Sequence, residues 1–241
     1  MSSIKSSVVA YQDLFTSSPT QSIELGTYVE TADGRGFRYV KAGAAALVPG
    51  KVQQAPAQDT TNQNPIGGLA VAAAAVGTFQ VTLTGTLTLA ENALAGGFMS
   101  VSVTPGQGYT YKVKGNTAVS SATDCVVTLE DPLQVALTTA STVVFQLNAY
   151  NGVIVAPATM TNIIVGVAIY PIAAGQYGWV QTRGPVSVLA GGNVTCGEAV
   201  GTLQAGTIGA LAAAIAGTPI IGHAMGTITS GEYDLVNLVL D

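Results

Sequence analysis

The chain has 241 residues and a net charge of −5, and only 9% of its residues are charged while 48% are hydrophobic. This length suits one large domain or two smaller ones. Ordinary soluble domains are about 25% charged, so this surface must consist mainly of Thr, Ser, Asn, Gln, Ala and Gly. The acidic balance argues against a nucleic-acid binder, which needs a basic stripe to neutralise phosphates.

Long uncharged tracts are a second unusual property of the sequence. Residues 132–182 contain no Asp, Glu, Lys, Arg or His, and residues 199–231 contain only His223. A free monomer normally uses mixed surface charge for solubility, so these tracts favour burial of much of the surface in an assembly. The alternative is a monomer with a Thr-rich polar surface.

Neither a membrane span nor a signal peptide is predicted. The most apolar stretch, residues 208–226, is mostly Ala and Gly and is interrupted by Pro219 and His223, whereas a span needs about 20 strongly apolar residues. Near the N-terminus only the tripeptide VVA is apolar before polar residues return, and a signal peptide needs about 7–15 such residues. We therefore expect synthesis in the cytoplasm.

The first part of the chain divides into three segments by composition. Residues 1–30 are rich in Ser and Thr and predict an extended N-terminal arm. Residues 36–52, GFRYVKAGAAALVPGKV, together with Arg35 contain four of the eight basic residues of the chain. Residues 53–65, QQAPAQDTTNQNP, predict a polar loop.

An alternating pattern begins at Phe79. In residues 79–89, FQVTLTGTLTL, the odd positions are apolar except Gly85, and the even positions are Gln or Thr. This period of two predicts a half-buried β-strand with the odd residues facing inward and a bend or bulge at Gly85. The alternation continues in residues 99–103 and 109–113, which a Pro- and Gly-containing turn joins.

The second half of the chain is also predicted to be β-structure. Asn151-Gly152 between two apolar runs predicts a type I′ hairpin, because both central residues of that turn need positive φ. Residues 233–241 predict a last strand with apolar residues on both faces. The one helical candidate is a short segment around residues 211–215, between glycines. We therefore expect an all-β protein, a sandwich or barrel of many short antiparallel strands with Gly-rich turns.

Composition also suggests a domain organisation. Residues 66–160 carry the clearest alternation and are predicted to form a central, protruding β-domain. Residues 31–65 and 161–241 then belong together in a second β-domain. The N-terminal arm, residues 1–30, precedes both.

Trp179 is the only tryptophan and lies close to an isolated Arg183 in a region otherwise without charge. Two compatible roles are open: a core Trp on a strand that ends at Arg183, or an interface anchor, because Trp, Tyr and Arg dominate binding hot spots. Residues 179–192, WVQTRGPVSVLAGG, also resemble residues 39–50, YVKAGAAALVPG. This similarity is either an internal repeat or a chance likeness of Ala- and Gly-rich sequence.

No constellation of catalytic residues is predicted. The only histidine, His223, lies in an apolar stretch, and the sequence has no Gly-x-Ser-x-Gly motif, so a structural role is favoured. The acid pairs Glu130/Asp131 and Glu232/Asp234 adjoin turn residues, which favours turn formation over glycosidase chemistry. Phosphate-binding glycine motifs do not occur in the sequence. We therefore expect no enzymatic activity and no cofactor.

Cys125 and Cys196 lie far apart in the sequence, and the chain has one histidine. Two cysteines with a single histidine do not supply the ligands of a tetrahedral zinc site, so we expect no metal. Buried free thiols are favoured over a disulfide.

Three segments carry a resemblance to a known family: GRGFRYVKAGAAALVPGKVQQA, VGVAIYPIAAGQYGWVQTRGPVSVLAGG and PIIGHAMGTITSGEYDLVNLVLD. They resemble the head decoration (cement) proteins of tailed bacteriophages and related virion components, over about a third to a half of the chain. The resemblance implies a β-rich structural protein on the capsid exterior of the virion. Such a protein forms small oligomers, dimers or trimers, binds the major capsid protein at subunit junctions and reinforces the shell. Neither nucleic acid nor membrane is an implied partner.

On this resemblance the basic stretch is a docking element whose charges complement acidic patches on the major capsid protein. The alternative is an ordinary amphipathic strand whose charges solvate a sheet edge. The candidate residues for capsid or protomer contacts are Arg35, Arg38, Tyr39, Lys41, Lys51, Trp179 and Arg183.

Two further functions suit the same fold. A receptor- or carbohydrate-binding module of a tail fibre or spike would present exposed aromatic residues, and the candidates are Tyr109, Tyr111, Tyr150 and Tyr177. A tail-tube or head-completion subunit would require ring symmetry.

Overall fold

The computed structural model describes residues 11–63, 68–121, 124–211 and 219–241. The chain forms two compact units: unit 1 contains Met1–Pro56 and Ala149–Asp241, and unit 2 contains Ala57–Asn148. Strands make up 44% of the chain, and the described residues contain no α-helix, which confirms the all-β prediction. The helix expected around residues 211–215 falls, after Leu211, outside the described residues.

Unit 1 has a single 3₁₀ turn among its described residues, η1 (Tyr11–Phe15), and a ten-stranded sheet in the order β1-β2-β12-β3-β13-β14-β18-β17-β15-β16. The strands of this sheet are β1 (Tyr28–Glu30), β2 (Gly36–Ala42), β3 (Val52–Gln54), β12 (Asn151–Val155), β13 (Ile164–Ala168), β14 (Tyr177–Leu189), β15 (Ala199–Thr202), β16 (Ile208–Ala210), β17 (Gly222–Ala224) and β18 (Tyr233–Val239).

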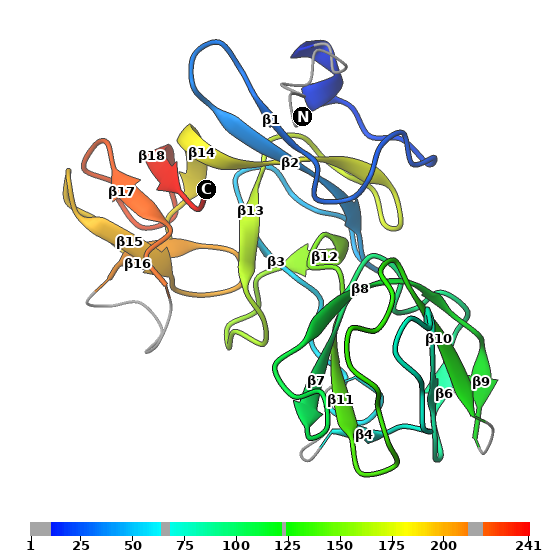
Figure 1. The fold of residues 1–241 in the computed structure, drawn as a ribbon. Helices are drawn as coiled ribbons and strands as arrows, with labels where there is room; N and C mark the ends of the chain where they lie inside the picture. The colour runs from blue at the N-terminus through cyan, green and yellow to red at the C-terminus, as the bar shows by residue number, and fades with distance from the viewer. Residues whose placement is uncertain (1–10, 64–67, 122–123, 212–218) are drawn as a thin grey trace. The chain divides into compact units, whose positions relative to one another are not determined.

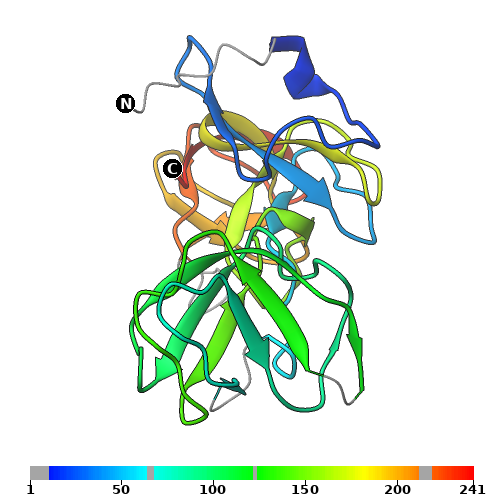
Figure 2. The same ribbon diagram turned by 45° about the vertical axis from the view of Figure 1, so that its right-hand side comes forward.

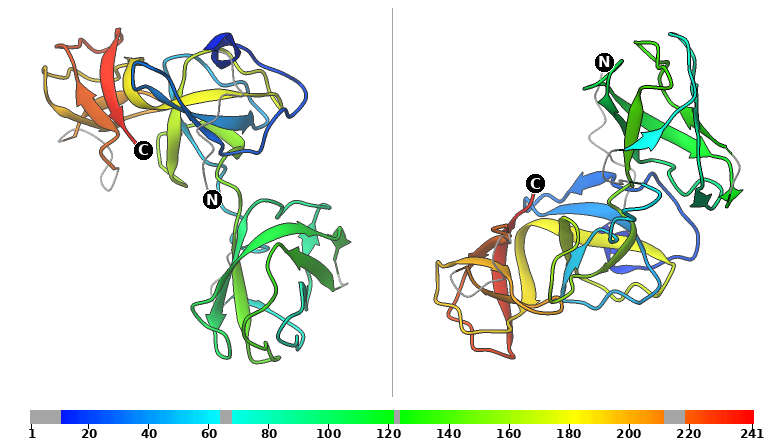
Figure 3. Two further views of the ribbon diagram at one scale, coloured as in Figure 1. Left: turned by 45° about the horizontal axis from the view of Figure 1, so that its top comes forward. Right: turned by 90° about the horizontal axis from the view of Figure 1, so that it is seen from below.

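The sheet of unit 1 closes twice. Because β14 also pairs with β2, strands β2-β12-β3-β13-β14 form a mixed five-stranded barrel, which we call ring 1 (Figure 1). In ring 1, β12 runs parallel to β2, and the other four pairs of neighbouring strands are antiparallel. Strands β14-β18-β17-β15-β16, coloured yellow to red in Figure 3, form ring 2. A single parallel bridge between Ala190 and Ile208 closes this ring.

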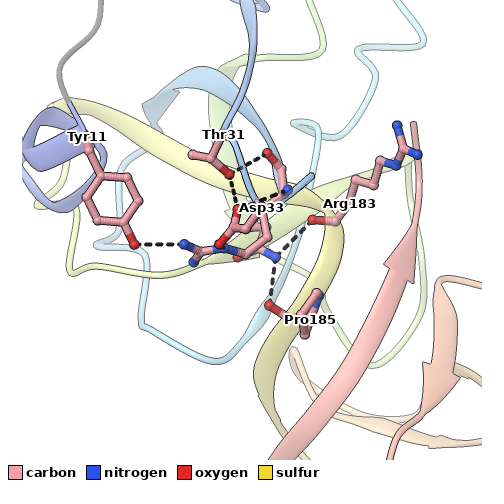
Figure 4. A network of polar contacts seen from close by, with 7 residues as sticks. Tyr11, Thr31, Asp33, Arg183 and Pro185 are labelled. Atoms are coloured by element: carbon pink, nitrogen blue, oxygen red, sulfur yellow. Dashed lines mark hydrogen bonds and ion pairs between the residues drawn. The ribbon is translucent and has the colours of Figure 1, made fainter.

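Strand β14 is long because it serves both rings. Its first half pairs with β2, and from Arg183 onwards it pairs with β18. At this changeover the register to β2 shifts after Gln181, and Gly184 has a φ of 82°, which glycine adopts without steric cost. The buried Gln181 amide donates hydrogen bonds of 2.9 Å to the carbonyl oxygens of Arg183 and Pro185 (Figure 4). One side chain thereby provides partners for two backbone acceptors of the bent strand.

Both faces of β2 are buried. Val40 and Ala42 belong to the core of ring 1, whereas Phe37 and Tyr39 pack with Trp179 on the other side of the strand. The chain before β2 covers this second face, where Leu14 is only 2% exposed. Of the segment predicted as an arm, the described part therefore lies against β2 and β14.

Two turns of ring 1 are joined as a symmetric pair. The backbone N–H of Leu47 donates to the carbonyl of Ile172 at 2.8 Å, and the N–H of Ile172 donates back at 3.2 Å. Each of these buried residues is followed three positions later by a glycine with positive φ, Gly50 at 71° and Gly175 at 72°. Each glycine N–H then bonds the carbonyl four residues before the partner's apolar residue.

Ring 2 repeats this arrangement. Val194 and Ile228 exchange hydrogen bonds of 3.0 and 2.8 Å, and Gly197 and Gly231 follow them with φ of 83° and 89°. The shared pattern is an apolar residue, two turn residues and Gly: LVPG, IAAG, VTCG and ITSG. Residues 39–50 and 179–192, which are similar in sequence, lie on neighbouring paired strands, with Tyr39 opposite Trp179. The feature that repeats in the structure is the pair of hydrogen-bonded turns, which occurs once in each ring.

Unit 2 is a nearly closed six-stranded antiparallel barrel in the order β4-β11-β7-β8-β10-β5 (Figure 2). A bridge between Val71 and Leu83 brings its two ends together, and Ala74 and Leu137 exchange hydrogen bonds as the paired turns do. Its strands, with the separate pair β6-β9, are β4 (Leu69–Ala70), β5 (Gln80–Leu83), β6 (Thr88–Leu89), β7 (Phe98–Val103), β8 (Thr110–Asn116), β9 (Val119–Ser120), β10 (Cys125–Leu129) and β11 (Thr142–Gln146).

Two predictions of local structure are wrong. Asn151 and Gly152 do not form a hairpin, because they begin β12, which pairs with β2 and β3, while β11 pairs with β4 and β7. The chain passes from unit 2 to unit 1 at this point, so the two apolar runs have different partners. Phe79 does not face inward, because it precedes β5 and is 48% exposed. The bend predicted at Gly85 is present, with a φ of 119° between β5 and β6.

The changeover in β14 generates a test. Replacing Gln181 by Ala removes two part-buried hydrogen bonds, each worth about 0.5–1.5 kcal/mol, so we expect the free energy of unfolding to fall by about 1–3 kcal/mol. Urea denaturation measures this change, with the exposed Gln204→Ala as the matched control that we expect to change stability by less than about 0.5 kcal/mol. Equal losses in the two variants would contradict the role of Gln181.

Candidate protein interface

Arg35 is held by partners within unit 1. Its Nε donates to Asp33 Oδ2 at 2.8 Å and its Nη2 donates to the Tyr11 hydroxyl at 2.7 Å (Figure 4). Its guanidinium carbon also lies 5.7 Å from the ring centroid of Phe37. The hydrogen bond to Tyr11 and the one to Asp33 raise the pKa of Arg35. The side chain thus ties η1 to the loop before β2.

Arg38 joins more segments than any other basic candidate. It binds both carboxylate oxygens of Asp241 at 2.7–3.1 Å and donates to the carbonyl of Gly26 at 2.9 Å. Its guanidinium carbon lies 5.4 Å from the ring centroids of both Tyr28 and Tyr150, at cation–π distance. Three segments of unit 1, around residues 26–28, 150 and 241, therefore meet at one side chain.

The ion pair between Arg38 and Asp241 shifts the pKa of both residues. The hydrogen bonds to Asp241 raise the pKa of Arg38. Burial acts to raise the pKa of Asp241, but the hydrogen bonds from Arg38 and Thr182 and the charge of Arg38 together outweigh it, so that pKa is lowered. Bidentate geometry of this kind gives stronger pairs than single surface contacts.

The remaining basic candidates also have neighbours in unit 1. The ammonium of Lys41 lies 5.4 Å from the ring centroid of Tyr177, and that of Lys51 donates to the carbonyl of Ala205 at 3.2 Å. Among the described residues, three basic candidates form ion pairs, and Arg183 is the most exposed of them. Its side chain is 53% exposed and lies 4.0 Å from Glu30. The structure does not gather Arg35, Arg38, Lys41 and Lys51 into one free patch.

Tyr39 and Trp179 lie in the core. They are 3% and 4% exposed, and their ring centroids are 5.1 Å apart at an angle of 60°. The Tyr39 hydroxyl accepts a hydrogen bond from the backbone N–H of Ser22. Of the two roles open for Trp179, the structure places it as a core residue on β14.

The tyrosines proposed for a carbohydrate site are not gathered. Tyr109 is 43% exposed and stacks on the buried Tyr111 in unit 2, whereas Tyr150 contacts Arg38 and Tyr177 stacks on Tyr39 in unit 1. Only Tyr109 among them offers a substantially exposed ring. The four residues therefore do not form a shared aromatic surface within either unit.

The described residues contain no group of three or more His, Cys, Asp or Glu placed to hold a metal ion. Both cysteines are free: Cys125 is buried, and burial raises the pKa of its thiol. Cys196 is exposed, so the expectation of a buried thiol is wrong there. Its Sγ lies 3.4 Å from the carbonyl oxygen of Met225. In the parts of the chain that the structure describes, no helix has the length and apolar character needed to cross a bilayer.

Ring 2 carries an exposed apolar surface to which none of the predicted interface residues contributes. On β18 the residues Val236 and Leu238 face the core, while the alternate residues face outward, and Tyr233, Leu235 and Val239 are 53%, 45% and 48% exposed. The register extends this face onto β14 and β17. We call it the outer face of ring 2 and define it by Pro185, Ser187, His223, Met225, Tyr233, Leu235, Asn237 and Val239.

A groove borders this outer face. Its volume is ≈ 460 Å³, and Pro185, Ser187, Tyr233 and Leu235 line one side of it, with Arg35 and other residues of unit 1 on the rest. The eight residues that define the outer face include no Asp, Glu, Lys or Arg, and the exposed Arg183, opposite Val239, ends the face on β14. The face therefore combines exposed apolar side chains with a few uncharged polar ones, and two cations adjoin it: Arg183 at its end and Arg35 in the groove.

No family model, curated protein or solved structure matches this chain. The geometry of the residues is therefore what supports a function.

Sequence reasoning missed the outer face of ring 2, although a signal for it was present. Residues 233–241 predict a strand with apolar residues on both faces, and ring 2 supplies a core for only one of these faces. The basic residues gave the stronger signal, but their partners are distant in sequence: Asp241 lies 203 positions from Arg38.

The Arg38–Asp241 pair predicts a pH dependence. Because the folded-state pKa of Asp241 lies below its ordinary value of 3.8, the pair stabilises the fold above that pH, and this contribution is lost as the pH falls through the lowered pKa. Asp241→Asn removes it at every pH. We expect the stability difference between the native chain and Asp241→Asn to be constant above about pH 5 and to shrink below pH ~4. Urea titrations at several pH values measure it, with the exposed Asp131→Asn as control, and a pH-independent difference would contradict the ion pair.

Proposed function

We propose that this chain is a structural virion protein that binds the outer surface of an icosahedral phage capsid and reinforces the shell. The observation that carries this proposal is the outer face of ring 2. Single exposed apolar residues are normal on a protein surface, but a face that runs across neighbouring strands without charge is typical of a protein-binding site. Tyr233, Leu235, Val239 and Met225 supply its apolar side chains, each about half exposed.

The rigidity of the support also favours a docking role. The three strands that bear the face, β14, β17 and β18, pair in register, and the residues between the exposed ones are buried in the core of ring 2. A surface held in this way loses little conformational entropy when it binds a partner. A fixed surface of this kind suits attachment to a preformed capsid lattice.

The basic residues have a smaller part in this proposal than the sequence suggested. Arg35 binds Tyr11 and Arg38 binds Asp241 within unit 1. In this proposal they hold the N-terminal segment in place and do not contact the capsid themselves. Arg183 lies at the end of the outer face, opposite Val239, and keeps an exposed side chain. A rim charge of this kind sets register and association rate against an acidic patch on the capsid protein more than it adds affinity.

The test uses the whole protein with undecorated expanded heads and proheads from a panel of tailed phages. We expect saturating, symmetric binding to expanded heads of at least one phage, seen by cryo-electron microscopy. Leu235→Asp should weaken this binding by about tenfold or more, because the charge would be buried without a partner. Val76→Asp in unit 2, where Val76 is 60% exposed, is the matched control and should bind as the native protein does.

Two results would count against the proposal. Absence of binding to every shell would overturn the capsid function. Binding that Leu235→Asp leaves unchanged would remove the outer face of ring 2 as the docking surface.

A further inference from the structure

A second surface lies in unit 2 and is independent of the outer face of ring 2. A groove with a volume of ≈ 550 Å³ runs along the outward side of β5, between residues 73–75 and β10. Three alanines at 73–75 form one wall, and Phe79 lies among its lining residues. This volume is within the ~300–1,000 Å³ typical of ligand sites.

Phe79 breaks the pattern of its own segment. The alternation of residues 79–89 places it on the inward side with Val81 and Leu83, which are fully buried, but Phe79 is 48% exposed. Leaving a large aromatic side chain in water forgoes the free energy of burying its apolar surface. Positions where a consistent local pattern fails are often functional sites.

The floor of the groove is polar but uncharged. Gln80 lies opposite Thr128 in the register of β5 and β10, and Thr82 follows on the same face. No hydrogen bond joins these three side chains to another residue in the described parts of the chain. Their amide and hydroxyl groups therefore remain available to a ligand as both donors and acceptors.

We propose that this groove binds a neutral saccharide. A pyranose ring has an apolar C–H face, which stacks on an aromatic ring, and a rim of hydroxyl groups, which pair with amides and hydroxyls. Phe79 supplies the first contact, and Gln80, Thr82 and Thr128 supply the second. Small alanine side chains at 73–75 leave room for a sugar ring to approach the strand.

Charge decides between a saccharide of this kind and a charged ligand. None of the residues that line the groove carries a charge. An anionic or cationic group placed there would lose hydration without a compensating partner, which disfavours acidic sugars and charged peptides. A purely apolar peptide would leave the three polar side chains unpaired.

The test measures binding of defined sugars to the full chain. The probes are maltohexaose, cellohexaose and N-acetylchitohexaose, with a galacturonate hexamer as the anionic comparison, followed by saturation-transfer NMR and calorimetry. We expect at least one neutral hexamer to bind, and Phe79→Ala to weaken its binding by about tenfold, the equivalent of one lost aromatic contact. Phe79→Trp should retain binding because it keeps the aromatic surface.

Phe98→Ala is the matched control, because Phe98 is another phenylalanine of unit 2 with 48% exposure and does not line the groove. Circular dichroism melts check that each variant folds. Three results would overturn the proposal: no neutral hexamer binds, the anionic hexamer binds equally well, or Phe79→Ala and Phe98→Ala have the same effect. None of these readouts involves a capsid, so they are distinct from the test of shell binding.

Discussion

The sharing of β14 between two closed rings is the constraint on which the rest of unit 1 depends. A strand can complete ring 1 with β2 and ring 2 with β18 only if it changes partners partway along its length. That change leaves backbone carbonyls at the bend, and the buried amide of Gln181 satisfies two of them. Val180 lies in the core of ring 1 and Val188 in the core of ring 2, so loss of the bend would disturb both cores together.

The paired turns close each ring in the same way, which explains why so many short strands hold together. A short strand pair has few hydrogen bonds of its own and is marginal when isolated. In each ring a buried apolar residue of one turn pairs with that of another, and a glycine with positive φ returns the chain to the next strand. A Cβ at Gly50 would also lie 2.6 Å from the ring of Tyr233 as placed, so a larger residue there would displace that ring in addition to straining φ.

The sequence predicted the elements whose information is local and failed where the information is long-range. Alternation located the buried Val81 and Leu83 and the two-faced apolar strand β18, because period-two burial depends on neighbouring residues. Asn151-Gly152 carries a strong local turn signal, but β12 pairs with β2 and β3, which lie about 100 positions earlier in the sequence. The basic candidates were visible as a cluster, whereas their acidic and aromatic partners, such as Asp241, were not deducible from spacing.

The two uncharged tracts of the sequence have different physical causes. Residues 132–182 include β13 and the first half of β14, which are buried almost throughout, because the core of ring 1 lies on one side and Phe37, Tyr39 and Leu14 pack near Trp179 on the other. Burial within the chain therefore accounts for the missing charge in these two strands without any partner. Residues 199–231 differ, because Met225 in this tract remains half exposed beside the equally apolar outward side of β18. In ring 2 the missing charge coincides with an exposed apolar face on the described residues, and there the argument from missing charge to an assembly has its main support.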